Sequence, residues 1–191
     1  MVGQLPTSLE LGGVVFKIRS DYREILNILV AFNDPDLTMQ ERWQVALICF
    51  YEDVANITDE TIDEAMGKIT WFISGGRMPE NHVQNKLPLY DWEQDESMIF
   101  SAINKVAGQE IRSLPYMHWW TFLGYFNEIG EGAFSTVVSI RNKQNKGKKL
   151  EKYEQEFIKD HADIFRLKSK LTEQEQKEAQ QFKDDINNLF K

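Results

Sequence analysis

Residues 116–126 read YMHWWTFLGYF, a stretch so rich in aromatic residues that its packing decides how the chain around it folds. Helical spacing places four of its apolar side chains on one stripe, namely Trp119, Phe122, Leu123 and Phe126. We therefore predict a helix over about 116–128 that buries this stripe in a core. Trp120 and Tyr125 lie on other faces of the same helix, and aromatic residues exposed at an interface act as anchors. We predict both as partner-binding residues.

The histidine in this stretch, His118, is its one candidate for chemistry. A catalytic histidine needs a nucleophile or a carboxylate partner, and the sequence shows neither. We expect the imidazole to be hydrogen-bonded to the backbone or to an acid at the rim of the core, with a partner contact as the alternative. The other histidines, His82 and His161, lie on different predicted elements, and Cys49 is the single cysteine. No metal-binding spacing results, so we predict no catalytic residue, no metal and no cofactor.

Helical spacing of apolar residues continues on both sides of the aromatic stretch. The predicted helices cover about 21–32, 39–50, 59–73, 92–107 and 133–142. Ser20 is the predicted N-cap of the first helix, and Thr38 with Glu41 has the spacing of a capping box before the second. Gly75 and Gly76 suit the left-handed end of the third helix, because glycine tolerates that conformation.

A different pattern precedes the first helix. Residues 8–19 read SLELGGVVFKIR, in which short β-rich segments flank Gly12 and Gly13. Two glycines supply the positive φ values of a tight turn, so we predict a small N-terminal β-hairpin over about 8–19. A two-stranded hairpin is marginal alone and must pack against the helices.

The C-terminal part of the chain is charged and sparse in apolar residues. We predict a solvated linker over 142–149 and charged helices near 150–169 and 173–190. Amphipathic helices of this kind need a partner or their own body to dock on. We predict four of their apolar residues as partner-binding: Phe157, Ile164, Phe182 and Ile186. The fold class is therefore mainly α, with a compact multi-helix domain over 1–145 and a charged helical extension over 146–191.

Charge is divided unevenly along the chain. Residues 1–140 carry 9 Lys and Arg against 20 Asp and Glu, a net charge of −11, whereas residues 141–191 carry 13 against 10, a net charge of +3. The acidic body argues against nucleic acid as the main partner, because phosphate binding needs clustered basic residues. No run approaches the roughly 20 apolar residues of a membrane span. The start of the chain lacks the features of a signal peptide, so we expect a cytosolic protein with no membrane partner.

Four segments in a fixed order resemble a known family. They are LPTSLELGGVVFKIRSDYREIL at 5–26, YDWEQDESMIFSAINKV at 90–106, LPYMHWW at 114–120 and FSTVVSIRNK at 134–143. Together they resemble the small tail assembly chaperone-like proteins of long-tailed, siphovirus-type phages of Gram-positive bacteria. The resemblance covers roughly 1–145 and brings no catalytic residues with it.

The resemblance implies a role in assembly and no reaction. Proteins of this kind are thought to coat the tape-measure protein, keep it soluble, gather subunits of the major tail protein, and leave before the virion is finished. We therefore expect a non-enzymatic tail assembly chaperone in the cytoplasm of the bacterial host, with these two proteins as partners and with self-association. The alternatives are a structural tail or connector protein retained in the virion, and a small regulatory protein that binds nucleic acid through its basic tail.

Overall fold

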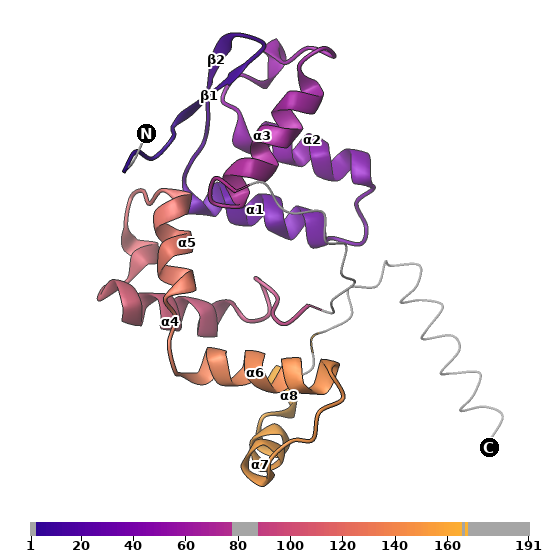
Figure 1. Cartoon of the computed structure of the whole chain (residues 1–191), viewed down its shortest axis with the longest axis vertical. Coiled ribbons are helices and arrows are strands. Elements are labelled where there is room, and N and C mark those ends of the chain that lie inside the picture. Colours follow the sequence, from indigo (N-terminus) through magenta and orange to yellow (C-terminus); the bar gives the residue numbers. More distant parts are fainter. Residues whose placement is uncertain (1–2, 78–87, 166, 168–191) are drawn as a thin grey trace, which may run out of the picture.

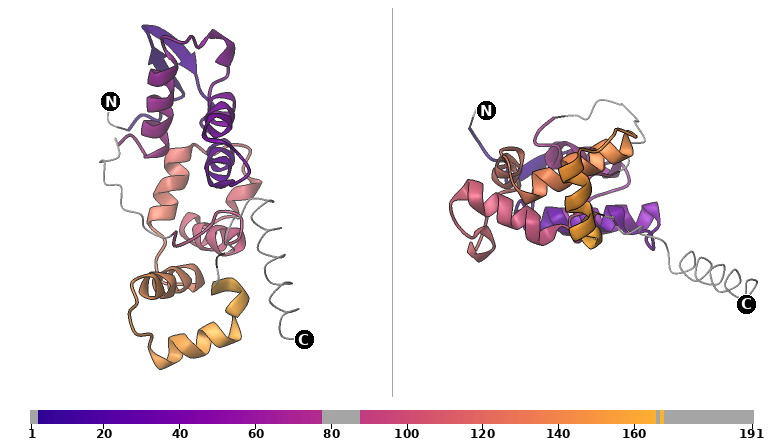
Figure 2. Two further views of the ribbon diagram at one scale, coloured as in Figure 1. Left: turned by 90° about the vertical axis from the view of Figure 1, so that its right-hand side faces the viewer. Right: turned by 90° about the horizontal axis from the view of Figure 1, so that it is seen from below.

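The computed structural model of the chain describes residues 3–77, 88–165 and 167. It is mainly α-helical with one small β-hairpin, which confirms the predicted fold class. Figure 1 shows the elements stacked along the longest axis, with the hairpin at one end and the last described helices at the other, and Figure 2 shows this order from the side. The helices are α1 (Tyr22–Asn33), α2 (Met39–Phe50), η1 (Val54–Asn56), α3 (Ile62–Ile73), α4 (Glu96–Ala107), η2 (Ile111–Ser113), α5 (Trp119–Asn127), α6 (Ala133–Asn145), α7 (Lys152–Asp160) and α8 (Ala162–Phe165).

The predicted hairpin is confirmed, with β1 (Ser8–Leu11) antiparallel to β2 (Val14–Lys17). Gly12 and Gly13 form its turn with φ values of 55° and 82°, the left-handed conformation that a type I′ turn needs at both positions. One face of the hairpin packs into the core. The turn also contacts α3, because the Gly12 N–H donates to Glu64 Oε2 at 2.9 Å. Helix contacts thus stabilise a sheet that is too small to stand alone.

Side-chain caps fix the starts of α1 and α2. The predicted capping box of α2 is confirmed: Thr38 Oγ1 accepts from the Glu41 N–H at 3.3 Å, and Glu41 Oε2 accepts from the Thr38 N–H at 2.8 Å. The predicted cap of α1, Ser20, is wrong by one residue. Asp21 is the N-cap and its carboxylate accepts from the Arg23 N–H at 2.9 Å, because an ionised oxygen is the stronger acceptor at a helix start.

An aromatic core joins α1, α4 and α5. Tyr22 of α1 stacks on Phe122 of α5 with ring centroids 4.7 Å apart, and both rings contact Phe100 of α4. Trp119 is buried, and its indole N–H donates to the carbonyl of Ile73 at 2.9 Å, which ties α5 to the end of α3. The predicted stripe on α5 is confirmed as core, since all four of its side chains lie in this cluster or pack against it.

A smaller second cluster lies beyond α5, at the lower end of Figure 1. Val137 and Ile140 of α6 are buried against Phe165 of α8. Phe157 of α7 and Ile164 of α8 pack around them, partly buried. The described part of the charged extension therefore docks on α6.

Helix boundaries in this region differ from those predicted. α6 continues to Asn145, so the linker predicted from residue 142 begins inside the helix. The single helix predicted near 150–169 is also wrong, because the backbone leaves the helical conformation at His161, with φ of −136° and ψ of 38°. This break separates α7 from α8 and lets the end of α8 reach the buried face of α6. The helix predicted over 173–190 lies outside the described residues.

Candidate partner-binding groove

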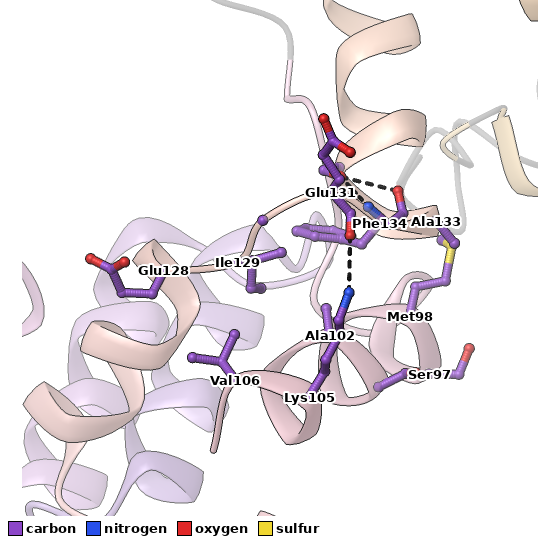
Figure 3. Close-up of a pocket in the computed structure, with 14 residues that line it drawn as sticks. Ser97, Met98, Ala102, Lys105, Val106, Glu128, Ile129, Glu131, Ala133 and Phe134 are labelled. Atoms are coloured by element: carbon purple, nitrogen blue, oxygen red, sulfur yellow. Dashed lines mark hydrogen bonds between the residues drawn. The ribbon is translucent and has the colours of Figure 1, made fainter. Parts of the chain in front are cut away.

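A groove of about 540 Å³ runs between α4 and the segment that connects α5 to α6 (Figure 3). One wall comes from residues 97–106 of α4, and the other comes from residues 128–135, which include the first turn of α6. The groove thus lies on the aromatic core, beside the second cluster. Its size falls within the range of sites that bind other molecules.

The walls of the groove are mostly apolar. Met98, Ala102 and Val106 lie four residues apart on α4, so they form one stripe along the helix. Ile129 and Phe134 line the opposite wall (Figure 3). Phe134 is buried, whereas Val106 is 37% exposed and accessible from the groove. This arrangement presents one helical row of apolar contacts to an incoming molecule.

Small residues keep the groove open. Ser97 and Ser101 directly precede the apolar positions Met98 and Ala102 of α4, and Gly130 and Gly132 lie in the connection on the other side. Serine and glycine extend little from the backbone, so another backbone can approach both walls closely. The small residues therefore leave room for the backbone of another segment near both walls.

Charged residues lie at the rim of the groove. Lys105 Nζ donates to the backbone carbonyl of Glu131 at 3.4 Å, which bridges the two walls (Figure 3). Glu128 and Glu131 place carboxylates on the connection. A contact of this length is weak, so an incoming polar group could displace it at small cost.

Hydrogen bonds within the first turn of α6 fix the second wall. The Gly132 N–H donates to Ser135 Oγ at 2.9 Å, and the Thr136 hydroxyl donates to the Gly132 carbonyl, also at 2.9 Å. The first bond pairs the N–H of the N-cap residue, and the second adds to the backbone bond that the Gly132 carbonyl already accepts from the Thr136 N–H. They hold Phe134 in place at the groove.

A buried ion pair anchors α6 to α4 behind the groove. Arg141 is 3% exposed and meets Asp95 in a bidentate pair, with Nη1–Oδ2 at 2.6 Å and Nη2–Oδ1 at 3.0 Å. The same guanidinium donates to the backbone carbonyls of Leu89, Ile164 and Phe165. One arginine therefore joins α4, α6 and α8. The sequence held one sign of this buried ion pair, because Arg141 lies on the same helix face as the apolar residues of α6.

His118 has a structural role at the start of α5. The helix begins at Trp119, three residues later than predicted, because His118 is its N-cap. His118 Nδ1 accepts from the Trp120 N–H at 3.0 Å, so Nε2 carries the ring proton and donates to the Pro6 carbonyl at 3.0 Å. The prediction of a hydrogen bond to backbone is confirmed. Burial lowers the pKa of His118, which favours this neutral ring.

Comparison with known proteins places these features in a family. A family model described as "Bacteriophage Gp15 protein" matches residues 1–167. The chain belongs to the bacteriophage Gp15 protein family. Comparisons with curated proteins and with solved structures gave no match. The predicted resemblance to a bacteriophage protein is confirmed at this level, and membership indicates a phage protein with a structural or assembly role.

The match to the Gp15 family spans every described element of the fold. It therefore includes both walls of the groove, the His118 cap and the Arg141–Asp95 pair. All three lie in the part of the chain that the family model matches.

Two predicted partner-binding residues of the Gp15-family protein, Trp120 and Tyr125, lie outside the groove. Both are half-buried and pack against the main core. The Trp120 indole N–H donates to the Phe72 carbonyl at 2.8 Å, and its ring contacts Trp71 with centroids 5.4 Å apart. These contacts assign Trp120 a packing role, and its use by a partner stays a prediction.

The predicted residues of the tail separate into two pairs. Phe157 and Ile164 pack against the second cluster from α7 and α8, where they hold the tail to α6. Phe182 and Ile186 lie outside the described residues. None of the four predicted residues that the structure describes lines the groove.

The described residues offer little for chemistry. Among them, no three His, Cys, Asp or Glu side chains are placed to hold a metal ion. Cys49 is half-buried, and burial raises the pKa of its thiol. Across the same ranges, no helix has the length and apolar character needed to cross a membrane. The groove has the size and the apolar walls to bind another molecule.

Proposed function

We propose that this Gp15-family protein is a non-enzymatic tail assembly chaperone of a long-tailed phage and that it binds amphipathic helices of the tape-measure protein. The observation that carries the proposal is the groove between α4 and the α5–α6 connection. Membership of a phage family with a structural or assembly role supports it, and so does the sequence resemblance to tail assembly chaperone-like proteins.

The groove suits the apolar face of a helix. Val106 lies eight residues after Met98 on α4, with Ala102 midway, which corresponds to about 12 Å along the helix axis. A partner helix with apolar residues at positions i, i+4 and i+8 presents a stripe of the same length. The small residues on both walls allow the two backbones to approach closely.

Charged residues at the rim of the groove favour partner helices that carry the complementary charges. Glu128 and Glu131 flank one wall and Lys105 flanks the other. A partner helix that carries Lys or Arg along one side of its apolar stripe would form ion pairs with Glu128 and Glu131. The net charge of −11 over residues 1–140 favours a partner with basic flanks and disfavours nucleic acid.

A long helical partner needs many copies of a small chaperone. We propose that copies of the protein self-associate along the tape-measure protein in the cytoplasm of the host, gather the major tail protein, and are absent from the mature virion. Head-to-tail contacts that do not close into a ring produce arrays of this kind.

Co-expression with the tape-measure protein tests the proposal, with a matched pair of charged variants. Val106→Glu places a carboxylate in the groove, and Ile48→Glu makes the same change at an exposed residue of α2, on a different part of the molecule. We expect the wild type and Ile48→Glu to co-purify with a soluble tape-measure protein and Val106→Glu to lose it. A tape-measure protein that is equally soluble alone, and that never co-purifies, would overturn the proposal.

Mass spectrometry of purified virions separates the chaperone from a connector. A chaperone leaves no stoichiometric trace in the particle, whereas a connector is retained at a defined copy number. If the protein is retained in the virion at a defined copy number, it is a structural tail protein, and the groove then serves a structural contact.

A further inference from the structure

A second surface lies at the opposite end of the molecule, on the outer edge of β2. β2 pairs with β1 along one edge, and among the described residues no other strand joins this sheet. Within the described ranges, the other edge meets a single bridge, between Ile18 and Tyr51. Around that bridge, the Arg19 N–H donates to the Phe50 carbonyl at 2.7 Å and the Glu52 N–H donates to the Lys17 carbonyl at 3.1 Å.

The bridge stops before it reaches the middle of β2. After Glu52 the chain turns into η1 and leaves the strand edge. In a two-residue hairpin the residues that flank the turn, Leu11 and Val14, form a hydrogen-bonded pair. The next pair, Glu10 and Val15, therefore directs its backbone N–H and C=O groups outward. Val15 offers one donor and one acceptor on an open edge.

The side chains around this edge are unusually apolar for an exposed strand. Val14 is 59% exposed and Val15 is 67% exposed. Edge strands are normally protected by charge, proline or a covering segment, because they pair readily with other chains. A groove of about 470 Å³ runs beside the edge, between β2 and residues 52–56. Val14 and Val15 point to opposite faces of the hairpin, so an extended segment would meet the unpaired backbone, one valine on each face, and this groove.

The charges around the edge favour one kind of occupant. Glu10 lies opposite Val15 in the hairpin, and Glu52 and Asp53 line the groove. Lys17 is the one basic residue on the β2 side of this groove. A second copy of the chain paired through the same edge would bring these carboxylates together, and like charges across strands are destabilising. A basic partner gains from the same arrangement.

We propose that the β2 edge binds an extended segment of a partner protein in which apolar residues alternate with Lys or Arg. The segment adds a third strand to the hairpin through the backbone groups of Val15. Its apolar side chains contact Val15 on the exposed face of the hairpin, and its basic side chains lie toward Glu52 and Asp53. Strand addition of this type draws its affinity from backbone hydrogen bonds and its specificity from alternate side chains. The surface is separate from the α4–α6 groove and does not depend on the function proposed for it.

Two capped model peptides test this inference on the full chain, one alternating valine with lysine and one alternating valine with glutamate. We expect the lysine peptide to bind and to shift the NMR amide signal of Val15, and the glutamate peptide to bind at least about tenfold more weakly. Failure of the lysine peptide to bind, or equal binding of both peptides, overturns the proposal.

Three variants locate the binding to the edge. Val15→Pro removes the outward N–H and leaves the bonds to β1 intact, so we expect it to abolish binding. Val15→Thr keeps the backbone groups and loses part of the apolar contact, so it should bind much more tightly than Val15→Pro. Glu52→Lys inverts a groove charge and should weaken the lysine peptide at least about tenfold, with unchanged thermal unfolding as the check on the fold. Full binding of the lysine peptide by Val15→Pro would show that the peptide does not bind at this edge, and would refute the proposal. A wild-type dimer in sedimentation experiments that Val15→Pro dissociates would show that the edge binds a second copy of the chain, and would refute it as well.

Discussion

His118 uses both ring nitrogens on backbone groups, and this places the imidazole in one protonation state. Nδ1 must stay unprotonated to accept from the Trp120 N–H, and Nε2 must stay protonated to donate to Pro6. A second proton would remove the cap of α5 and bury a charge. The aromatic stretch therefore places a pH-sensitive contact between the N-terminal segment and the core.

This contact makes stability depend on pH. Burial lowers the pKa of His118 in the folded protein below its usual value of 6.5. The unfolded chain then binds more protons at mildly acidic pH, so the stabilisation is complete above about pH 6.5 and decreases as the pH falls toward the folded pKa. We expect the free energy of unfolding, measured by urea titration, to decrease from pH 7 to pH 5.

His118→Asn isolates the contribution of the ring. Asparagine is a strong N-cap and does not titrate, but it cannot also reach Pro6. At pH 7 we expect the variant to be less stable by about 1 kcal/mol, the usual net value of one hydrogen bond. Its stability should change less between pH 7 and pH 5 than that of the wild type. Identical pH slopes in the two proteins would contradict this role.

At the level of the elements, Arg141 and Asp95 connect helices that share few other polar contacts. Their bidentate pair is buried, and the guanidinium also satisfies carbonyl groups at the end of α8. A cation at a helix C-terminus interacts favourably with the helix dipole. α8 is only four residues long, so its position depends on this tertiary contact more than on its own helix propensity.

Removal of one partner of this pair should be costly. Asp95→Ala leaves a buried arginine without its counter-charge, and we expect a loss of about 3–5 kcal/mol in the free energy of unfolding. Lys68→Ala breaks an exposed pair with Glu64 on α3 and should change it by less than about 0.5 kcal/mol. Hydrogen exchange should also accelerate in α7 and α8 of Asp95→Ala. Equal effects of the two substitutions would show that the buried pair is not a major anchor.

On the scale of the whole molecule, the end of the described chain covers an apolar face of the body. Val137 and Ile140 of α6 are 1% and 0% exposed because α7 and α8 lie over them. The second cluster is therefore completed by residues far along the chain. It also adjoins the groove, because Met98 lines the groove and packs against the cluster.

Truncation shows whether this cover matters. A chain that ends at Lys149 lacks α7 and α8, so we expect it to bind more of a hydrophobic fluorescent dye and to self-associate in sedimentation experiments. A chain that ends at Leu167 keeps the cover and should behave like the full-length protein in both measurements. Equal dye binding by the two truncated chains would contradict the covering role.

Local signals predicted the elements well, and contacts between distant residues were missed. The hairpin turn at Gly12 and Gly13 and the capping box of Thr38 and Glu41 were predicted, because all the groups involved are neighbours in sequence. The cap role of His118 was missed because histidine is not among the residues that usually cap a helix start, and its bond to Pro6 was missed because it reaches 112 residues back. The partner of Arg141 lies 46 residues away for the same reason.

The groove itself could not be predicted from helical spacing. Its walls come from α4 and from a connection that follows α5, and spacing within α4 does not show that the two lie side by side. Trp120 and Tyr125 attracted the binding prediction because aromatic residues off the core stripe are typical of interfaces. In the fold they lie against the main core, where other elements provide contacts that no single helix pattern contains.

The bond from His118 to Pro6 also has a consequence for the order of events during synthesis. The hairpin and the first three helices leave the ribosome well before residue 118, and at about 5–20 residues per second the interval lasts several seconds. The contact between His118 and Pro6 closes a loop of 112 residues, and the entropic cost of closing it must be offset by other contacts. We therefore expect the formation of this contact to limit the folding rate. The pulling force on stalled nascent chains of increasing length tests this order. We expect cooperative folding only in chains long enough for the YMHWWTFLGYF stretch to have left the ribosome. Cooperative folding of shorter chains would show that the N-terminal half folds without this stretch.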